Sequence, residues 1–341
     1  MDQQRQIIKL GTIVIVFAIS LRLLGGGILS SFVDNPRFLS FLIYLQTGRA
    51  VRFSPDAPNP PELFIPETTA PQPSVPSPTD PTEETILQWE IPAFVPEDLD
   101  DIKIKDNCDL KPDLEALLLS QLSWTLTGEE PTVLIVHTHA TECYTPAKGE
   151  NYEQYGAFRT LDENYNMVSI GTEVAKILTA GGISVIHDTT YHDYPNYNNS
   201  YSNSRKAIKA YLKAYPSIQI VLDIHRDASG DLSNQMVTVG SVGGQRSAQL
   251  MLVVGTHISG GSKHPWQENL ALALKTSVLL EQTDPGLTRY ISLRSERFNM
   301  DLSPGSMLAE VGAAGNTHAE AVLAAQALAR AILALSQGAN E

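Results

Sequence analysis

Val133-Leu-Ile-Val-His137-Thr-His139-Ala-Thr-Glu142 is a run of four aliphatic residues that leads directly into two histidines and a glutamate. Such a run is typical of a strand buried on both faces, as in a central parallel strand. Ligands of open α/β sheets bind beyond the carboxyl ends of these strands. His137 and His139 would share one face if the chain stayed extended, and a short loop can bring Glu142 to join them. The stretch therefore predicts a sheet edge that carries a binding site.

A second apolar stretch, residues 218–227 (IQIVLDIHRD), also ends in a histidine among charged residues. Asp223, Arg226 and Asp227 flank His225 and are suited to orient its imidazole. A strand histidine satisfied by hydrogen bonds is the simpler interpretation of His225 taken alone. Histidine and carboxylate side chains from two strand ends are, however, the ligand types of a catalytic zinc ion. The two stretches together predict a Zn²⁺ site with the ligands His137, His139, Glu142 and His225.

Predicted strands and helices alternate around these stretches, from about residue 102 to the C-terminus. Residues 166–180 have apolar positions at helical spacing and are followed by two glycines, a signal for the end of a helix. Strand and helix continue to alternate through the predicted strand at 307–311 and the predicted helix at 317–335. The alternation predicts an α/β fold with a mostly parallel sheet and helices on both faces.

An acidic residue, Glu310, interrupts the apolar strand predicted at 307–311 (MLAEV). Burial of a carboxylate is unfavourable unless the group is paired or has a chemical role. One interpretation is a salt bridge from Glu310 to Arg294 or Arg297. The other is a general base for hydrolysis at the metal site, with its pKa raised by burial.

The 341-residue chain is acidic, with 24 Lys+Arg against 38 Asp+Glu and a formal net charge of −14. A nucleic-acid partner would require a basic surface, so the composition predicts no such partner. The two cysteines, Cys108 and Cys143, are too few for a disulfide scaffold. Both are interpreted as unpaired thiols, with Cys143 as an alternative soft metal ligand beside Glu142.

The N-terminal part of the chain differs in composition from the rest. Residues Ile7–Leu24 are almost wholly apolar and predict an uncleaved membrane anchor, with a cleaved signal peptide as the alternative. Twelve of the 21 prolines fall within residues 54–96, which predicts an extended, semi-rigid linker. The predicted domains are a membrane anchor with a juxtamembrane segment (1–50), a Pro/Ser/Thr-rich linker (51–101) and a catalytic domain (102–341).

Four motifs carry a resemblance to a known family: HTHATE at 137–142, DIHRD at 223–227, RFNMD at 297–301, and LAEVG at 308–312 followed by Asn316. In this order they resemble the stage II sporulation protein P family of endospore-forming bacteria. The domain further resembles zinc-dependent N-acetylmuramoyl-L-alanine amidases. The resemblance implies a membrane-anchored peptidoglycan hydrolase that cleaves the N-acetylmuramoyl-L-alanine bond in septal wall degradation and engulfment during sporulation.

The resemblance also implies a second, endopeptidase activity on peptide cross-links, and partners among other sporulation wall-remodelling proteins. The predicted anchor and linker suit this family. Together they predict a single-pass protein of the cell membrane, with its catalytic domain on the extracytoplasmic side that faces the wall.

The resemblance assigns roles to individual residues. His139 and His225 match zinc ligands, and Glu310 matches the catalytic glutamate. The glutamate ligand is Glu142 by its spacing, whereas the amidases take theirs at the start of the first long helix, which here points to Asp162 or Glu163. His137 is either a ligand in place of His139 or a residue behind the ligands. The predicted catalytic residues are Glu310 and Arg226, and the predicted substrate-binding residues are Arg297, Asn299 and Asn316.

Two other functions fit the same residues. One is a catalytically inactive, membrane-anchored module that binds the wall and recruits partners. The other is a metallocarboxypeptidase, because His139-x-x-Glu142 matches the zinc motif of those enzymes. The presence of the candidate ligands together with Glu310 favours a wall hydrolase over an inactive module.

Overall fold

The computed structural model describes residues 94–338, apart from 123–124, 127, 157, 232–233 and 257–265. The predicted anchor at Ile7–Leu24 and nearly all of the predicted linker lie outside the described residues. The boundaries at residues 50 and 101 therefore stay predictions.

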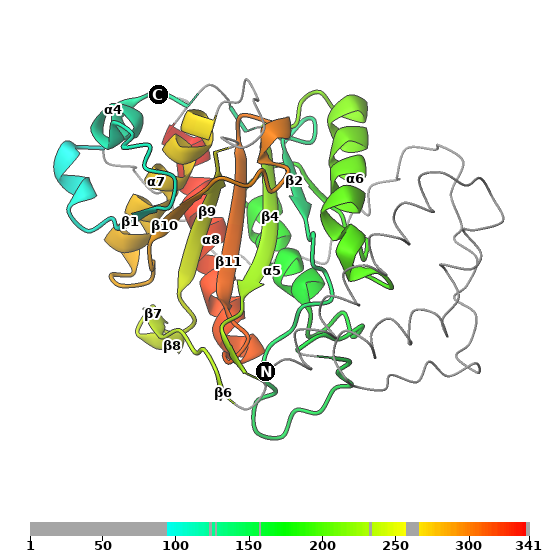
Figure 1. Ribbon diagram of the computed structural model, residues 1–341. Coiled ribbons are helices and arrows are strands. Elements are labelled where there is room, and N and C mark those ends of the chain that lie inside the picture. The colour runs from blue at the N-terminus through cyan, green and yellow to red at the C-terminus, as the bar shows by residue number, and fades with distance from the viewer. Residues whose placement is uncertain are drawn as a thin grey trace, which may run out of the picture. The chain divides into compact units, whose positions relative to one another are not determined.

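Seven strands form the main sheet of the described chain: β1 (Ile104–Asp106), β2 (Val133–Val136), β3 (Val185–His187), β4 (Ile220–Asp227), β9 (Leu250–Gly255), β10 (Ile291–Arg294) and β11 (Ser306–Ala313). Their order across the sheet is β1-β10-β9-β11-β4-β2-β3 (Figure 1). Neighbouring strands are parallel except β9 and β11, which are antiparallel. Two hairpins separate β4 from β9 in the sequence: β5 (Gly230–Asp231) with β6 (Asn234–Gln235), and β7 (Gly240–Val242) with β8 (Gln245–Ser247).

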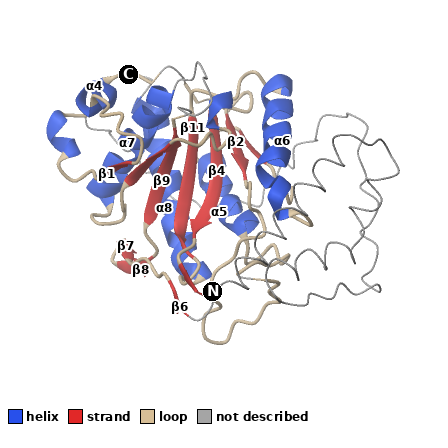
Figure 2. Ribbon diagram, viewed as in Figure 1, coloured by secondary structure: helices blue, strands red, loops and turns tan. Residues whose placement is uncertain are grey.

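Helices pack on the sheet, as Figure 2 shows. They are η1 (Pro96–Leu99), α4 (Leu114–Leu119), α5 (Met167–Ala180), η2 (Tyr197–Asn199), α6 (Ser200–Ala214), α7 (Trp266–Thr283), η4 (Met300–Leu302) and α8 (His318–Gly338).

The sheet separates two hydrophobic clusters, and the alternation of side chains along β2 shows it. Val133 and Ile135 belong to the larger cluster, which includes residues of α5, α7 and α8. Leu134 and Val136 belong to the smaller cluster, which includes Ile208 and other residues of α6. Successive strand residues point to opposite faces, so helices cover both faces. The predicted fold class, a mostly parallel sheet with helices on both faces, is confirmed.

The antiparallel pairing of β9 with β11 was not part of the prediction. Parallel strands need a long crossover connection, which is usually a helix. The segment between β4 and β9 contains the two hairpins in place of a helix. The chain therefore enters β9 in the opposite direction.

Among the described helices, α8 is the one that is long and apolar enough to cross a membrane. Its position in the fold gives another reason for its composition. Leu328 and Ile332 are fully buried in the larger hydrophobic cluster, and Gln326 Nε2 donates a 2.9 Å hydrogen bond to Glu173 of α5. In this domain α8 is a core helix.

The parallel register of β11 with β4 places Glu310 directly beside His225. The register then shifts between Glu310 and Ala313, where Gly312 has a φ of 69°. A Cβ added to Gly312 would lie 2.7 Å from the Cβ of Ala248, so the close approach and the positive φ both require glycine. Such a bulge locally breaks the pairing next to a candidate functional residue.

Candidate active site

His225 is buried near the carboxyl end of β4 and lies among three carboxylates. Its Nε2 is 3.0 Å from Asp223 Oδ1, and Asp223 accepts hydrogen bonds from Thr138 N (2.8 Å) and Oγ1 (2.6 Å). Although burial opposes the charged form, Asp223, Glu310 and Glu142 raise the pKa of His225 to about 9. His225 Nδ1 faces Glu142, with its Oε2 at 3.9 Å. A carboxylate beside the other ring nitrogen is the usual arrangement around a metal-binding histidine.

His139 lies in the turn that follows β2, because the chain leaves the extended conformation after Val136. The backbone N–H of Glu142 donates to His139 O (3.0 Å) and closes this turn. The His139 ring is perpendicular to that of His225, with 5.2 Å between the centroids. The Tyr197 ring stacks on His139 at 4.6 Å, and the Tyr201 ring meets it edge-on at 5.5 Å. The turn thus directs His139 toward His225.

Glu142 is buried beside both histidines and is held by Arg226. Glu142 Oε1 lies 3.6 Å from Arg226 Nη1, and its Oε2 lies 3.4 Å from Arg226 N. Burial alone would raise the pKa of Glu142, but Arg226, His139 and His225 keep it below the usual value. A deprotonated carboxylate in this position is suited to bind a cation.

Glu310 provides the third carboxylate next to His225. The residue is partly exposed, but its Oε2 is buried and makes no hydrogen bond. Desolvation raises the pKa of Glu310 to about 8, against the opposing effect of His225. No salt bridge joins Glu310 to Arg294 or Arg297 among the described residues. The interpretation of Glu310 as a salt-bridge partner is therefore not supported.

The donor set fits a zinc ion. Buried polar atoms without a hydrogen bond are rare in folded proteins, yet His139 Nδ1 and Glu310 Oε2 both lie in this cluster without one. Two ligands of a tetrahedral zinc ion lie about 3.4 Å apart, so the 3.9 Å between His225 Nδ1 and Glu142 Oε2 is slightly too wide. No three His, Cys, Asp or Glu side chains in the described part of the chain are yet close enough to hold a metal. His139, Glu142 and His225 are the residues that would hold one.

His137 does not join this cluster. Its Nδ1 lies 3.2 Å from Ile224 O and its Nε2 lies 2.8 Å from His187 Nε2. The ring lies against α5, where a Cβ at Gly171 would be only 2.4 Å from His137 Nε2. The turn after β2 breaks the strand alternation that predicted a shared face for His137 and His139. The structure places His137 behind the ligands, the second of its two predicted roles.

Replacement of His137 by alanine is expected to leave zinc binding intact and to destabilise the fold. The variant leaves Ile224 O and His187 Nε2 without their buried partner, at a cost of about 1–3 kcal/mol for each stranded group. Metal analysis and denaturant unfolding of the purified variant would measure the two effects. A folded H137A protein without zinc would show that His137 is a ligand.

Arg226, a predicted catalytic residue, contacts Glu142 and two backbone carbonyls. The side chain is buried, and its Nε donates to Cys143 O (2.9 Å) while its Nη2 donates to Phe158 O (2.8 Å). These bonds connect β4 to the loop after β2 and fix the guanidinium beside Glu142. The Nε and Nη2 donors of Arg226 are therefore bonded to backbone carbonyls of the protein.

Asn316, a predicted substrate-binding residue, makes its hydrogen bonds within the protein. Its fully buried Oδ1 accepts hydrogen bonds from Ala313 N (3.0 Å) and from Thr238 N and Oγ1 (both 3.1 Å). Its Nδ2 donates to Thr238 O and to Glu320 Oε2. The side chain therefore has no hydrogen-bonding capacity left for a ligand and instead holds the turn after β11.

The alternative ligands are not with the histidines. Asp162 Oδ1 accepts hydrogen bonds from the backbone and side chain of Asn164, and Glu163 is exposed. Cys143 is free and buried, and its backbone carbonyl accepts a hydrogen bond from Arg226 Nε. Burial raises the pKa of its thiol to about 12. A thiol this weakly acidic is a poor metal ligand at neutral pH. Glu142 remains the carboxylate ligand that the geometry favours.

Several residues of the site were missed in the sequence. Asp193 Oδ2 lies 4.0 Å from His139 Nδ1 and accepts a hydrogen bond from Thr141 Oγ1 (2.5 Å). The guanidinium of Arg159 lies over the Tyr197 ring at 4.2 Å and 3.5 Å from Asp193. In the sequence, the richness in Tyr and Asn of the loop after β3 was the one feature that could have indicated Asp193 and Tyr197 as part of the site. Because β3 is parallel to β2, that loop leaves the sheet at the same edge as the His139 turn.

These features define an α/β protein with a buried cluster of histidines and carboxylates near the carboxyl ends of β2 and β4. The sequence matches the family model described as Stage II sporulation protein P (SpoIIP) over residues 75–333. The chain belongs to this family. The matched residues include the whole candidate site.

A curated relative is Stage II sporulation protein P of Bacillus subtilis (strain 168), which is 29% identical over 215 residues. The match covers 60% of this chain and 50% of the relative, so the chain spans about half the length of that protein.

Solved structures similar to this chain are N-acetylmuramoyl-L-alanine amidases. Ami1 from Mycobacterium abscessus is 14% identical with a TM-score of 0.39, and covers 63% of this chain and 100% of its own. The catalytic domain of CwlV from Bacillus (Paenibacillus) polymyxa var. colistinus is 17% identical with a TM-score of 0.34, and covers 59% and 96% of the two chains.

Proposed function

We propose that this protein is a membrane-anchored peptidoglycan hydrolase that cleaves the N-acetylmuramoyl-L-alanine amide bond during sporulation, in septal wall degradation and engulfment. Membership of the stage II sporulation protein P family supports the setting. The observation that carries the chemistry is the buried Oε2 of Glu310, which has no hydrogen bond and lies beside His225 in the same cluster as the unbonded Nδ1 of His139. A carboxylate next to a candidate metal site is the arrangement of hydrolases that activate water.

The residues divide the chemical work. Zn²⁺, held by His139, Glu142 and His225, would polarise the amide carbonyl as a Lewis acid. Glu310 takes a proton from the attacking water at Oε2 and delivers it to the leaving amine nitrogen. Asp223 orients His225, and Arg226 holds Glu142 in place. These contacts would orient the proposed ligands His225 and Glu142.

Digestion of purified cell wall by the full-length chain in detergent, with zinc and with a chelator, tests this function. The expected result is zinc-dependent appearance of new L-alanine amino termini. Loss of cross-linked peptides in the same digest would show the endopeptidase activity that the family resemblance implies. Wall binding without any released product would instead support the inactive module, and digestion of free peptides alone would support a carboxypeptidase.

We also propose that the Ile7–Leu24 segment holds the protein in the cell membrane with its domain facing the wall. Partners among other wall-remodelling proteins of sporulation would then meet it on that side. Full-length protein is expected in the membrane fraction and accessible to protease added outside spheroplasts. A chain with residues 7–24 deleted is the control and should be released. Full-length protein recovered in the cytoplasmic fraction would contradict the anchor.

A further inference from the structure

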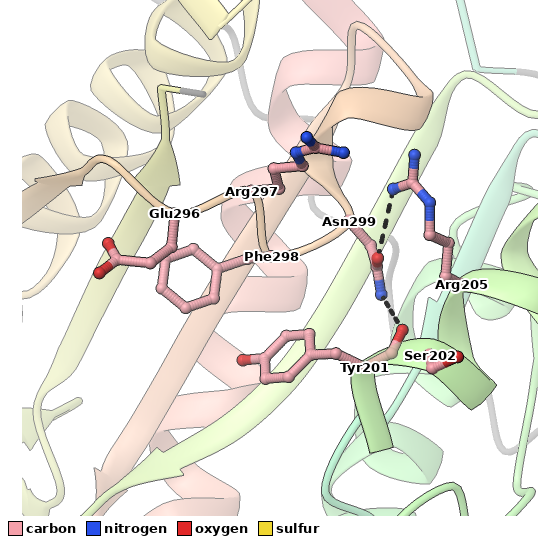
Figure 3. Close-up of a pocket in the computed structure, with 7 residues that line it drawn as sticks. All are labelled: Tyr201, Ser202, Arg205, Glu296, Arg297, Phe298 and Asn299. Atoms are coloured by element: carbon pink, nitrogen blue, oxygen red, sulfur yellow. Dashed lines mark hydrogen bonds between the residues drawn. The ribbon is translucent and has the colours of Figure 1, made fainter. Parts of the chain in front are cut away.

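A cavity of about 450 Å³ lies between the start of α6 and the turn at residues 296–299. Figure 3 shows its walls: Tyr201, Ser202 and Arg205 come from α6, and the turn contributes Glu296, Arg297, Phe298 and Asn299. The volume is within the range of small-molecule binding sites.

The side chain of Tyr201 lies between this pocket and the histidine cluster. Its ring centroid is 6.4 Å from that of His225, with the rings nearly parallel, and 5.8 Å from that of Phe298 in the pocket wall. A ligand that spans both places needs on the order of two to four extended residues, at about 3.3–3.6 Å each. The pocket is therefore within reach of the peptide part of a substrate whose amide lies at His225.

The charges of the pocket single out one arginine. Arg205 makes a bidentate ion pair with Asp301, with both N–O distances at 2.5 Å, so its charge is already compensated. Arg297 is exposed, and its guanidinium makes no hydrogen bond or ion pair with the described residues. Figure 3 shows Glu296 pointing away from the Arg297 guanidinium. Arg297 is thus the uncompensated cation of the pocket.

The turn that carries Arg297 is held in an unusual conformation. Phe298 and Asn299 have φ values of 47° and 58°, in the left-handed region that a bulky residue such as phenylalanine rarely adopts. The side chain of Asn299 fixes the turn to α6, because its Nδ2 donates to Tyr201 O (3.1 Å) and to Ser204 Oγ (3.0 Å). Backbone strain of this kind persists where the surrounding structure enforces it, often at binding sites. Asn299 is therefore a positioning residue for the turn that carries Arg297, two residues before it.

We propose that this pocket binds a free carboxylate of the stem peptide, with the Arg297 guanidinium as its partner, two to four residues from the cleaved amide. This proposal rests on the proposed function, and it names the stem-peptide carboxylate as the part of the substrate that the pocket recognises. Arginine binds a carboxylate through two parallel hydrogen bonds, which gives both charge and geometric selectivity. Tyr201 then lies between the reacting bond and the carboxylate, and sets the distance between them.

Binding of synthetic peptides to the full-length chain in detergent tests the pocket without hydrolysis. The probes are L-alanyl-D-glutamyl tripeptides with all carboxylates free, with the glutamate α-carboxylate amidated, or with the third-residue carboxylate amidated. One of the amidated probes is expected to bind about tenfold more weakly, as loss of a charge-assisted pair predicts. In R297Q this difference should vanish, and R297K should retain only part of it because lysine lacks the planar fork.

Arg294→Gln is the matched control, because it removes the same charge from an exposed arginine outside the pocket. Equal affinities for all three probes, or a preference that persists in R297Q, would overturn the carboxylate assignment. Hydrolysis of N-acetylmuramoyl tripeptides by the unmodified protein is measured separately. If that hydrolysis fails while the peptide preference depends on Arg297, the pocket stands and the proposed reaction does not.

Discussion

Replacement of Glu310 by glutamine is expected to lower turnover on cell wall about 100- to 10,000-fold, the range typical of a positioned proton transfer. Glutamine has nearly the shape of glutamate but cannot accept the proton of the attacking water. Glu310 lies beside His225 in the register of β11 with β4, yet its Oε2 has no partner in the protein. Zinc content and substrate affinity should therefore remain. Steady-state kinetics and metal analysis of E310Q would measure the separation.

Glu173→Gln is the control for this variant. Glu173 lies on α5, where its carboxylate accepts a hydrogen bond from Gln326, away from the cluster. Turnover should be nearly unchanged in E173Q. If E310Q lost its zinc instead of its turnover, Glu310 would be a ligand, and Glu142 would be the first alternative as the base.

Replacement of His225 by alanine is expected to abolish zinc binding and wall hydrolysis together. His225 lies among Asp223, Glu142 and Glu310, so it is the side chain that all the other groups of the cluster face. Removal of one of three protein ligands leaves a catalytic zinc site incomplete. Metal analysis, a wall digest and near-UV circular dichroism of H225A would test the prediction.

His318→Ala is the control, since it removes a different histidine, one that is partly buried. His318 Nε2 is 2.7 Å from Ser169 Oγ and does not belong to the cluster. H318A should keep its zinc. An H225A protein that retains stoichiometric zinc with a native spectrum would show that His225 is not a ligand.

The parts of the fold that follow from local patterns could be predicted from the sequence. Runs of aliphatic residues identified β2 and β4, and their histidines indicated the sheet edge. The errors came from what patterns do not contain. Strand alternation does not reveal that the chain turns after Val136, so His137 was grouped with His139. β9 runs antiparallel to β4 because two hairpins, and no helix, connect them. The alternation of predicted strands and helices did not predict this connection.

Roles of single polar residues were harder to predict than the position of the site. Asn316 follows a motif that resembles a catalytic one, and its five hydrogen bonds within the protein become visible only in three dimensions. Asp193 was missed for the converse reason. It lies in a loop without a distinctive motif, and the parallel pairing of β3 with β2 brings that loop to His139.

The burial of α8 has a consequence for the topology of the whole chain in the membrane. A hydropathy profile would count this helix as a second span after Ile7–Leu24 and would return the end of the polypeptide to the compartment where it began. Because α8 packs against α5 inside the domain, it would not add a second span to the anchor proposed at Ile7–Leu24. With that anchor, α8 would be exported together with the histidine cluster, and the translocation machinery would have to let this apolar helix pass without releasing it sideways into lipid.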